Sequence, residues 1–153
     1  LVVVSATAGI EDEHERAERR ARDAALADRC VAIGVDAFLL EWTSQPLFSS
    51  LPHDAVEFAT RSHDANGLAM ALRRMGTGTQ FPLDEQLSRC PTPSLIIAGE
   101  NDSKFVREAQ RLHECLSNSR VVIVPKAGHA AHLEQPERFI GLVLEFLRRV
   151  HAG

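Results

Sequence analysis

A short apolar run that ends in a glycine-histidine turn constrains the fold of this chain more than any other feature. Residues 121–124 are four consecutive β-branched side chains, and Pro125 and Gly128 close the run. Such a pattern predicts a buried strand, and His129 stands just beyond its carboxyl end. Because open α/β sheets keep their chemistry at the carboxyl ends of the strands, His129 is a candidate catalytic base.

Two other short apolar runs, residues 1–4 and 94–98, also predict strands. Apolar stripes at helical spacing predict helices over residues 104–116 and 136–150. The stripe of the second helix consists of Phe139, Leu142, Val143, Phe146, Leu147 and Val150. Strands that alternate with helices indicate a parallel sheet flanked by helices, so the predicted fold class is α/β.

The segment between the first two strands is predicted to be helical, with helices over residues 11–33, 35–42 and 53–75. In the third helix, Leu68, Leu72 and Met75 recur at helical spacing. An ordinary crossover between parallel strands needs only about a dozen residues. We therefore predict a core made of residues 1–10 and 88–153, with residues 11–87 forming a helical lid.

The composition argues against several classes of protein. The 153 residues are 44% hydrophobic and 25% charged, with a formal net charge of -4, a balance without bias toward nucleic acids or membranes. Cys30, Cys90 and Cys115 are odd in number and widely spaced. This spacing favours reduced thiols in the cytosol over a disulfide framework, so we expect a cytoplasmic protein.

Asp102 stands beyond the run at residues 94–98, as His129 stands beyond residues 121–124. An acid and then a histidine in two neighbouring turns match the last two members of a hydrolase triad, in which the acid orients the imidazole. In one alternative, Asp102 only caps the next helix and His129 is a solvated turn residue. In another, these two residues bind a metal with His132 and Glu134, but no recognised ligand motif is present, so we expect neither metal nor cofactor.

Two of these segments resemble the acid and histidine motifs of α/β-hydrolase-fold enzymes. They are Ala-Gly-Glu-Asn-Asp-Ser-Lys-Phe at 98–105 and Ala-Gly-His-Ala-Ala-His-Leu-Glu-Gln-Pro at 127–136. Within that superfamily, residues 45–51 and 75–80 resemble the 2-succinyl-6-hydroxy-2,4-cyclohexadiene-1-carboxylate synthases of menaquinone biosynthesis. The resemblance implies the carboxyl-terminal portion of an α/β-hydrolase fold with a helical lid insertion.

The resemblance also implies a carbon–oxygen lyase. Enzymes of this branch eliminate pyruvate from 2-succinyl-5-enolpyruvyl-6-hydroxy-3-cyclohexene-1-carboxylate. Their Ser-Asp-His triad abstracts a proton instead of transferring an acyl group. Asp102 and His129 match the acid and the base of that triad.

The same resemblance points to residues that bind the substrate. Arg19 and Arg61 match arginines that bind the carboxylates of the substrate, and the alternative for each is a solvated helix position. Trp42 matches an aromatic lid position, and its alternative is packing within the lid. Thr43 stands where many relatives have a tyrosine, so that contact is not expected here.

The chain has no G-x-S-x-G nucleophile elbow. Ser5 follows a strand but lacks the glycine that precedes the serine in that motif, so we expect Ser5 to be structural. We expect the chain to begin within a domain, to need the amino-terminal half of the same fold as its partner, and to be inactive alone. The alternatives are a fragment of a carboxylesterase-like hydrolase and a non-catalytic binding or assembly module.

Overall fold

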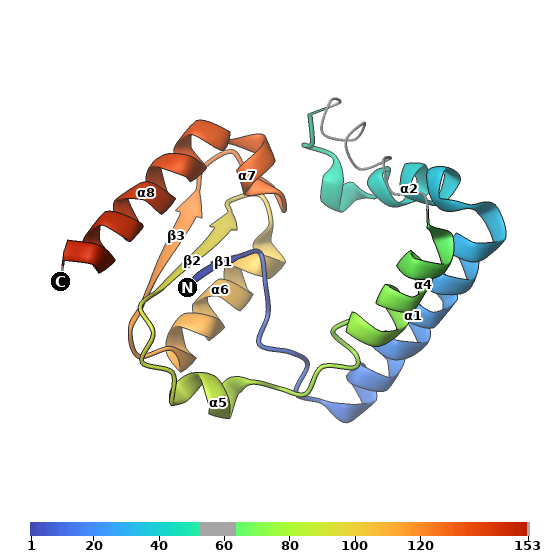
Figure 1. The fold of residues 1–153 in the computed structure, drawn as a ribbon, viewed down its shortest axis with the longest axis horizontal. Coiled ribbons are helices and arrows are strands. Elements are labelled where there is room, and N and C mark those ends of the chain that lie inside the picture. Colours follow the sequence, from blue (N-terminus) through green and yellow to red (C-terminus); the bar gives the residue numbers. More distant parts are fainter. Residues whose placement is uncertain (53–63, 153) are drawn as a thin grey trace. The chain divides into compact units, whose positions relative to one another are not determined.

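The computed structural model describes residues 1–52 and 64–152, which form two compact units (Figure 1). The sheet unit contains Leu1–Ala8, Leu47–Pro52 and residues 83–152. The helical unit contains Gly9–Pro46 and residues 64–82. Each unit has a hydrophobic core of its own.

A three-stranded parallel sheet organises the sheet unit. Its strands are β1 (Val2–Val4), β2 (Ser94–Gly99) and β3 (Ser119–Val124), in the order β1-β2-β3. Ile96 lies opposite both Val3 and Val121. This sheet confirms the predicted α/β class. β3 begins earlier than predicted, because Ser119 already pairs with the first residue of β2.

The two faces of the sheet are covered by different helices (Figure 1). Successive side chains of a strand point to opposite faces, and β2 is buried along its whole length. On one face, Ile96 and Ala98 pack against α6 (Ser103–Cys115). On the other face, Leu95 and Ile97 pack against α8 (Pro136–Ala152). The residues of α8 that make this contact are Phe139, Leu142, Val143 and Phe146.

The apolar stripe of α8 extends further along the helix than its contact with the sheet. Leu147 and Val150 are 41% and 40% exposed. Packing against the sheet ends at Phe146, so the later apolar residues of the helix remain at the surface.

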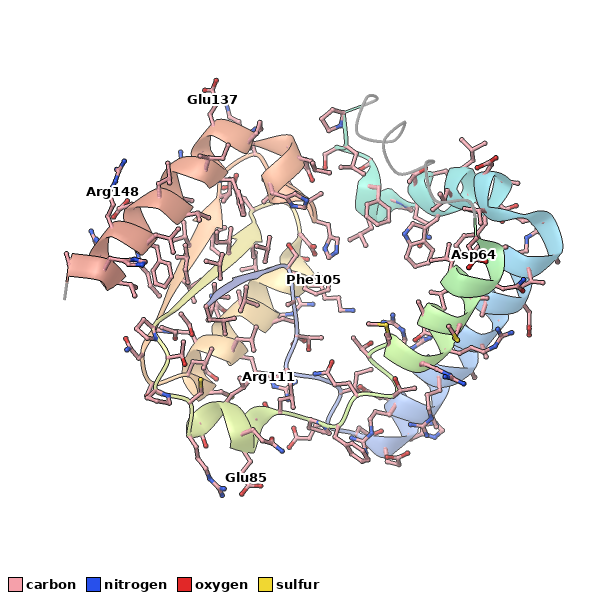
Figure 2. The ribbon with its side chains drawn as sticks, viewed as in Figure 1. Asp64, Glu85, Phe105, Arg111, Glu137 and Arg148 are labelled. Atoms are coloured by element: carbon pink, nitrogen blue, oxygen red, sulfur yellow. The ribbon has the colours of Figure 1, made fainter. Side chains whose placement is uncertain are left out.

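Short elements outside the predicted helices belong to the sheet unit. They are η1 (Pro46–Phe48), which lies mostly in that unit, α5 (Asp84–Ser88) and α7 (Ala131–Glu134). Arg111 of α6 holds α5, since its Nη2 lies 2.7 Å from Asp84 Oδ1 (Figure 2). Such short elements carry too little periodicity to be assigned from sequence. The lid over residues 11–87 stays a prediction.

The helical unit is built from α1 (Glu13–Ile33), α2 (Val35–Thr43) and α4 (Ala65–Met75). Asp12 caps α1 by accepting a hydrogen bond from the Glu15 amide at 2.8 Å. Gly34, with φ of 81°, separates α1 from α2 at a backbone angle that glycine adopts readily. Among the helices that the structure describes, none is long and apolar enough to cross a membrane.

The helix predicted over residues 53–75 is only partly accessible to comparison, because residues 53–63 lie outside the described residues. Its described part begins at Ala65, where the Asp64 side chain caps the helix by accepting from the Asn66 amide at 3.0 Å. Leu68 and Leu72, which recur at helical spacing, pack into the helical core. Met75 does not, since it is the last residue of α4 and is 82% exposed.

Candidate active site

His129 and Asp102 meet beyond the carboxyl ends of β3 and β2. His129 Nδ1 lies 2.8 Å from Asp102 Oδ2. The side chain of Asp102 is 5% exposed and that of His129 is 24% exposed. A carboxylate oxygen accepts hydrogen bonds, so this contact favours the tautomer with the proton on Nδ1. Nε2 is then an acceptor, and residues 1–52 and 64–152 provide no hydrogen-bond donor to it. This is the arrangement that a general base requires.

Asp102 both caps α6 and contacts His129. Its Oδ1 accepts a hydrogen bond from the Phe105 amide at 3.3 Å and so caps α6. Its Oδ2 faces His129. The cap anchors the carboxylate to the first turn of a helix, which orients the second oxygen toward the imidazole.

Two phenylalanine rings contact the imidazole of His129. The Phe105 ring, labelled in Figure 2, has its centroid 4.6 Å from the imidazole centroid. The Phe48 ring of η1 lies at 6.0 Å, edge on. In the sequence analysis, Phe105 lies within the predicted helix over residues 104–116, and neither Phe105 nor Phe48 is assigned to the site. Their positions inside the motifs at 98–105 and 45–51 were the available signal.

The turns after β2 and β3 approach each other closely. The Asn101 amide donates to the Ala127 carbonyl at 2.8 Å. A Cβ added to Gly99 would lie 2.0 Å from the Gly128 carbonyl oxygen and 2.4 Å from that of Ala127. Only glycine fits between these backbones, so Gly99 permits the short distance between the two turns.

The residues proposed to bind substrate lie in the helical unit or outside the described residues. Arg19 extends from α1, with its Nε 2.9 Å from Oδ1 and 3.0 Å from Oδ2 of Asp23. Asp23 is buried, and within the described parts of the chain no group binds the Nη groups of Arg19. Trp42 stacks on Phe38 with ring centroids 6.0 Å apart and packs against the helical core. Arg61 lies outside the described residues.

The alternative of a metal site finds no support in the residues that the structure describes. Across residues 1–52 and 64–152, no three His, Cys, Asp or Glu side chains are grouped so that they could hold a metal ion. His132 is exposed, and its ring lies 5.9 Å from that of Phe139. Glu134 is occupied by backbone amides.

Comparison with known proteins decides the family. The model of the alpha/beta hydrolase family matches residues 1–142. The chain belongs to the alpha/beta hydrolase family. This membership accounts for the parallel sheet and for an acid and a histidine placed beyond successive strands.

Individual relatives resemble the chain over nearly its whole length. The chain is 41% identical, over 98% of its length, to the putative 2-succinyl-6-hydroxy-2,4-cyclohexadiene-1-carboxylate synthase of Bacillus subtilis, and covers 57% of that protein. It is 35% identical to the protein PHYLLO, chloroplastic, of Arabidopsis thaliana, covering 98% of this chain and 10% of PHYLLO. The structure of MenH from S. aureus matches 97% of this chain and 58% of its own, with a TM-score of 0.93 and 33% identity. The chain thus spans a little over half the length of these bacterial relatives.

Asp102 and His129 match two members of the predicted Ser-Asp-His triad, and no residue of the chain matches the serine of the elbow motif. Asp102 and His129 are in hydrogen-bond contact, but the 153 residues contain no G-x-S-x-G. Ser5 is not aligned as a nucleophile toward the imidazole, since its hydroxyl donates to the backbone carbonyl of His129 at 2.7 Å.

Proposed function

We propose that this chain supplies the acid and the base of a carbon–oxygen lyase. The enzyme would eliminate pyruvate from 2-succinyl-5-enolpyruvyl-6-hydroxy-3-cyclohexene-1-carboxylate, as a 2-succinyl-6-hydroxy-2,4-cyclohexadiene-1-carboxylate synthase of menaquinone biosynthesis. The observation that carries the proposal is the hydrogen bond between His129 Nδ1 and Asp102 Oδ2. The similarity to the Bacillus subtilis protein supports this choice of substrate. The spacing of the three cysteines supports a cytoplasmic location.

In the proposed reaction, His129 moves one proton. Its Nε2 accepts the hydroxyl proton of a serine as the serine oxygen removes a proton from the substrate ring. The electron pair of the broken C–H bond forms the new C=C bond, and the C–O bond to the enolpyruvyl group breaks. Asp102 stabilises the imidazolium that forms, which then returns its proton as the enolpyruvate leaves and becomes pyruvate. Phe48 and Phe105 pack beside the imidazole and limit its contact with water.

The serine and the oxyanion-hole donors are proposed to come from residues outside this chain, in the amino-terminal half of the same fold. Two observations support this. The chain covers 57% of its Bacillus subtilis relative. β1 is also an edge strand of three valines within the described sheet. An apolar edge of this kind is usually paired or covered, and a further strand would pair with it.

The test joins the chain to a segment that bears a G-x-S-x-G elbow and measures pyruvate release in a coupled assay with lactate dehydrogenase. Release of pyruvate with formation of the conjugated diene is the expected result. Strong hydrolysis of a p-nitrophenyl ester without pyruvate release would favour the carboxylesterase alternative, which uses the same Asp–His pair. A folded but inactive fusion would favour the non-catalytic module.

Arg19 is proposed to bind a substrate carboxylate, together with Arg61. Asp23 holds the Nε side of the guanidinium, which leaves the Nη donors for the ligand. We expect Arg19→Ala to raise KM for the enolpyruvyl substrate by about tenfold or more, since hydrogen bonds to charged groups contribute about 1.5–3 kcal/mol. Hydrolysis of a small neutral ester should not change.

Arg22→Ala is the matched control, because Arg22 lies on the same helix and is exposed. It should leave both reactions unchanged. An equal loss on the carboxylate substrate and on the neutral ester in Arg19→Ala would contradict the proposed carboxylate contact.

A further inference from the structure

The backbone on both sides of His129 is held by two side chains that the proposed reaction does not use. Glu134 Oε2 accepts a hydrogen bond from the Gly128 amide at 2.6 Å, and Oε1 accepts one from the Ala130 amide at 3.0 Å. Ser5 Oγ donates to the carbonyl oxygen of His129 at 2.7 Å. Three consecutive residues of the turn thus have a backbone group bound by a side chain.

The Glu134 carboxylate binds the turn that precedes its own helix. Glu134 is the last residue of α7, which begins directly after the turn, so its carboxylate folds back over the preceding residues. A charged acceptor makes stronger hydrogen bonds to amides than a neutral one. Gly128 leaves room for the carboxylate, because an added Cβ would lie 3.1 Å and 3.2 Å from its two oxygens and 2.5 Å from Ser50 Oγ.

Ser5 reaches the turn from an unusual backbone conformation. Its φ is 43°, in the left-handed region that residues other than glycine seldom adopt. Its amide donates to the Ile97 carbonyl at 2.9 Å, so Ser5 is tied to β2 while its hydroxyl binds His129. Unfavourable backbone angles of this kind are concentrated at functional sites.

We propose that Glu134 and Ser5 are positioning residues for His129. By fixing the backbone of residues 128–130, they keep Nδ1 at hydrogen-bond distance from Asp102 Oδ2, and this hydrogen bond selects the tautomer in which Nε2 is free to accept a proton. A displacement of about 1 Å in such a group is enough to lower a reaction rate by about a hundredfold. The inference rests on the proposed role of His129 as the base, but it can be tested without catalysis.

The experiment measures the tautomer of His129 by ¹⁵N NMR of the imidazole in this chain. In the unmodified chain, the Nδ1–H form should dominate. Glu134→Ala removes both acceptors and should lower the ratio of Nδ1–H to Nε2–H by about fivefold, the effect of a weakened hydrogen bond. Glu134→Gln keeps the size of the side chain but only one acceptor, and Ser5→Ala removes the donor, so both should lower the ratio as well.

Glu100→Gln is the matched control. Glu100 Oε2 accepts a hydrogen bond from the Lys126 amide at 3.0 Å. This variant therefore weakens a carboxylate–amide contact between the turns after β2 and β3 without removing a hydrogen bond of residues 128–130. Its tautomer ratio should equal that of the unmodified chain. An equal fall in Glu100→Gln would overturn the inference by showing a general loss of structure.

Unchanged ratios in folded variants would also overturn the inference. Folding is judged by the dispersion of amide signals, and if Glu134→Ala does not fold, Glu134→Gln and Ser5→Ala decide. The outcome is separate from that of the pyruvate assay. If the variants shift the tautomer ratio but the fusion releases no pyruvate, the positioning role is retained and the lyase is rejected. If the fusion releases pyruvate but the variants leave the ratio unchanged, the lyase is retained and the positioning role is rejected.

Discussion

His129→Ala is expected to lower kcat for pyruvate release by roughly a thousandfold or more in the protein completed by a nucleophile-bearing segment. The base and the nucleophile act as a unit, so removal of the imidazole removes most of the contribution of both. Thermal stability should change little, because the ring is partly exposed and its backbone contacts do not depend on the side chain. Steady-state kinetics and a thermal melt on the same preparation check both expectations.

Two companion variants make this result specific. His132→Ala removes an exposed imidazole three positions along the chain, and its kcat should stay near that of the unmodified protein. Asp102→Asn keeps an oxygen that can cap α6, but its amide group cannot accept from Nδ1–H. Its kcat should therefore fall strongly while α6 remains capped. Substantial activity in His129→Ala would mean that His129 is not the base, and an equal loss in His132→Ala with sensitivity to chelators would revive the metal alternative.

The sheet and the Asp–His pair were accessible from sequence because local patterns encode them. Runs of β-branched residues mark buried strands, and turn residues mark where those strands end. β2 is predicted at residues 94–98 and observed at Ser94–Gly99. Parallel strands place their carboxyl ends at one edge of the sheet, so Asp102 and His129 were expected to be close. Asp102 Oδ2 lies 2.8 Å from His129 Nδ1.

The remaining features of the site depend on contacts between distant parts of the chain. Phe48 packs on His129 from a short segment between longer helices. No periodic pattern in the sequence links Phe48 to His129. Ser5 contacts a carbonyl 124 positions later. Glu134 carries no local sign that its carboxylate binds amides instead of solvent. Met75 and Leu147 satisfy helical spacing but lie beyond the packed part of their helices, so their exposure was not predictable from the pattern.

Gly99→Ala is expected to destabilise this chain by about 3 kcal/mol or more, the upper range for overpacking a buried site. The methyl group would lie 2.0 Å from the Gly128 carbonyl oxygen and 2.6 Å from the Ala127 carbonyl carbon. Both are backbone atoms, so no flexible side chain can move aside. The measurement is urea denaturation followed by circular dichroism, with the free energy of unfolding compared at equal m-values.

Gly141→Ala is the matched control for this prediction. Gly141 lies within α8, and an added Cβ there meets no atom within 4 Å. Alanine is the better helix former, so this variant should be stabilised by up to about 1 kcal/mol. The opposite signs separate the steric role of Gly99 from any general response to alanine. If Gly99→Ala were as stable as the unmodified chain, the turns after β2 and β3 would have to move apart. The Asp102–His129 hydrogen bond would then be free to lengthen. In that case, the close approach of the two turns would not be what holds Asp102 beside His129.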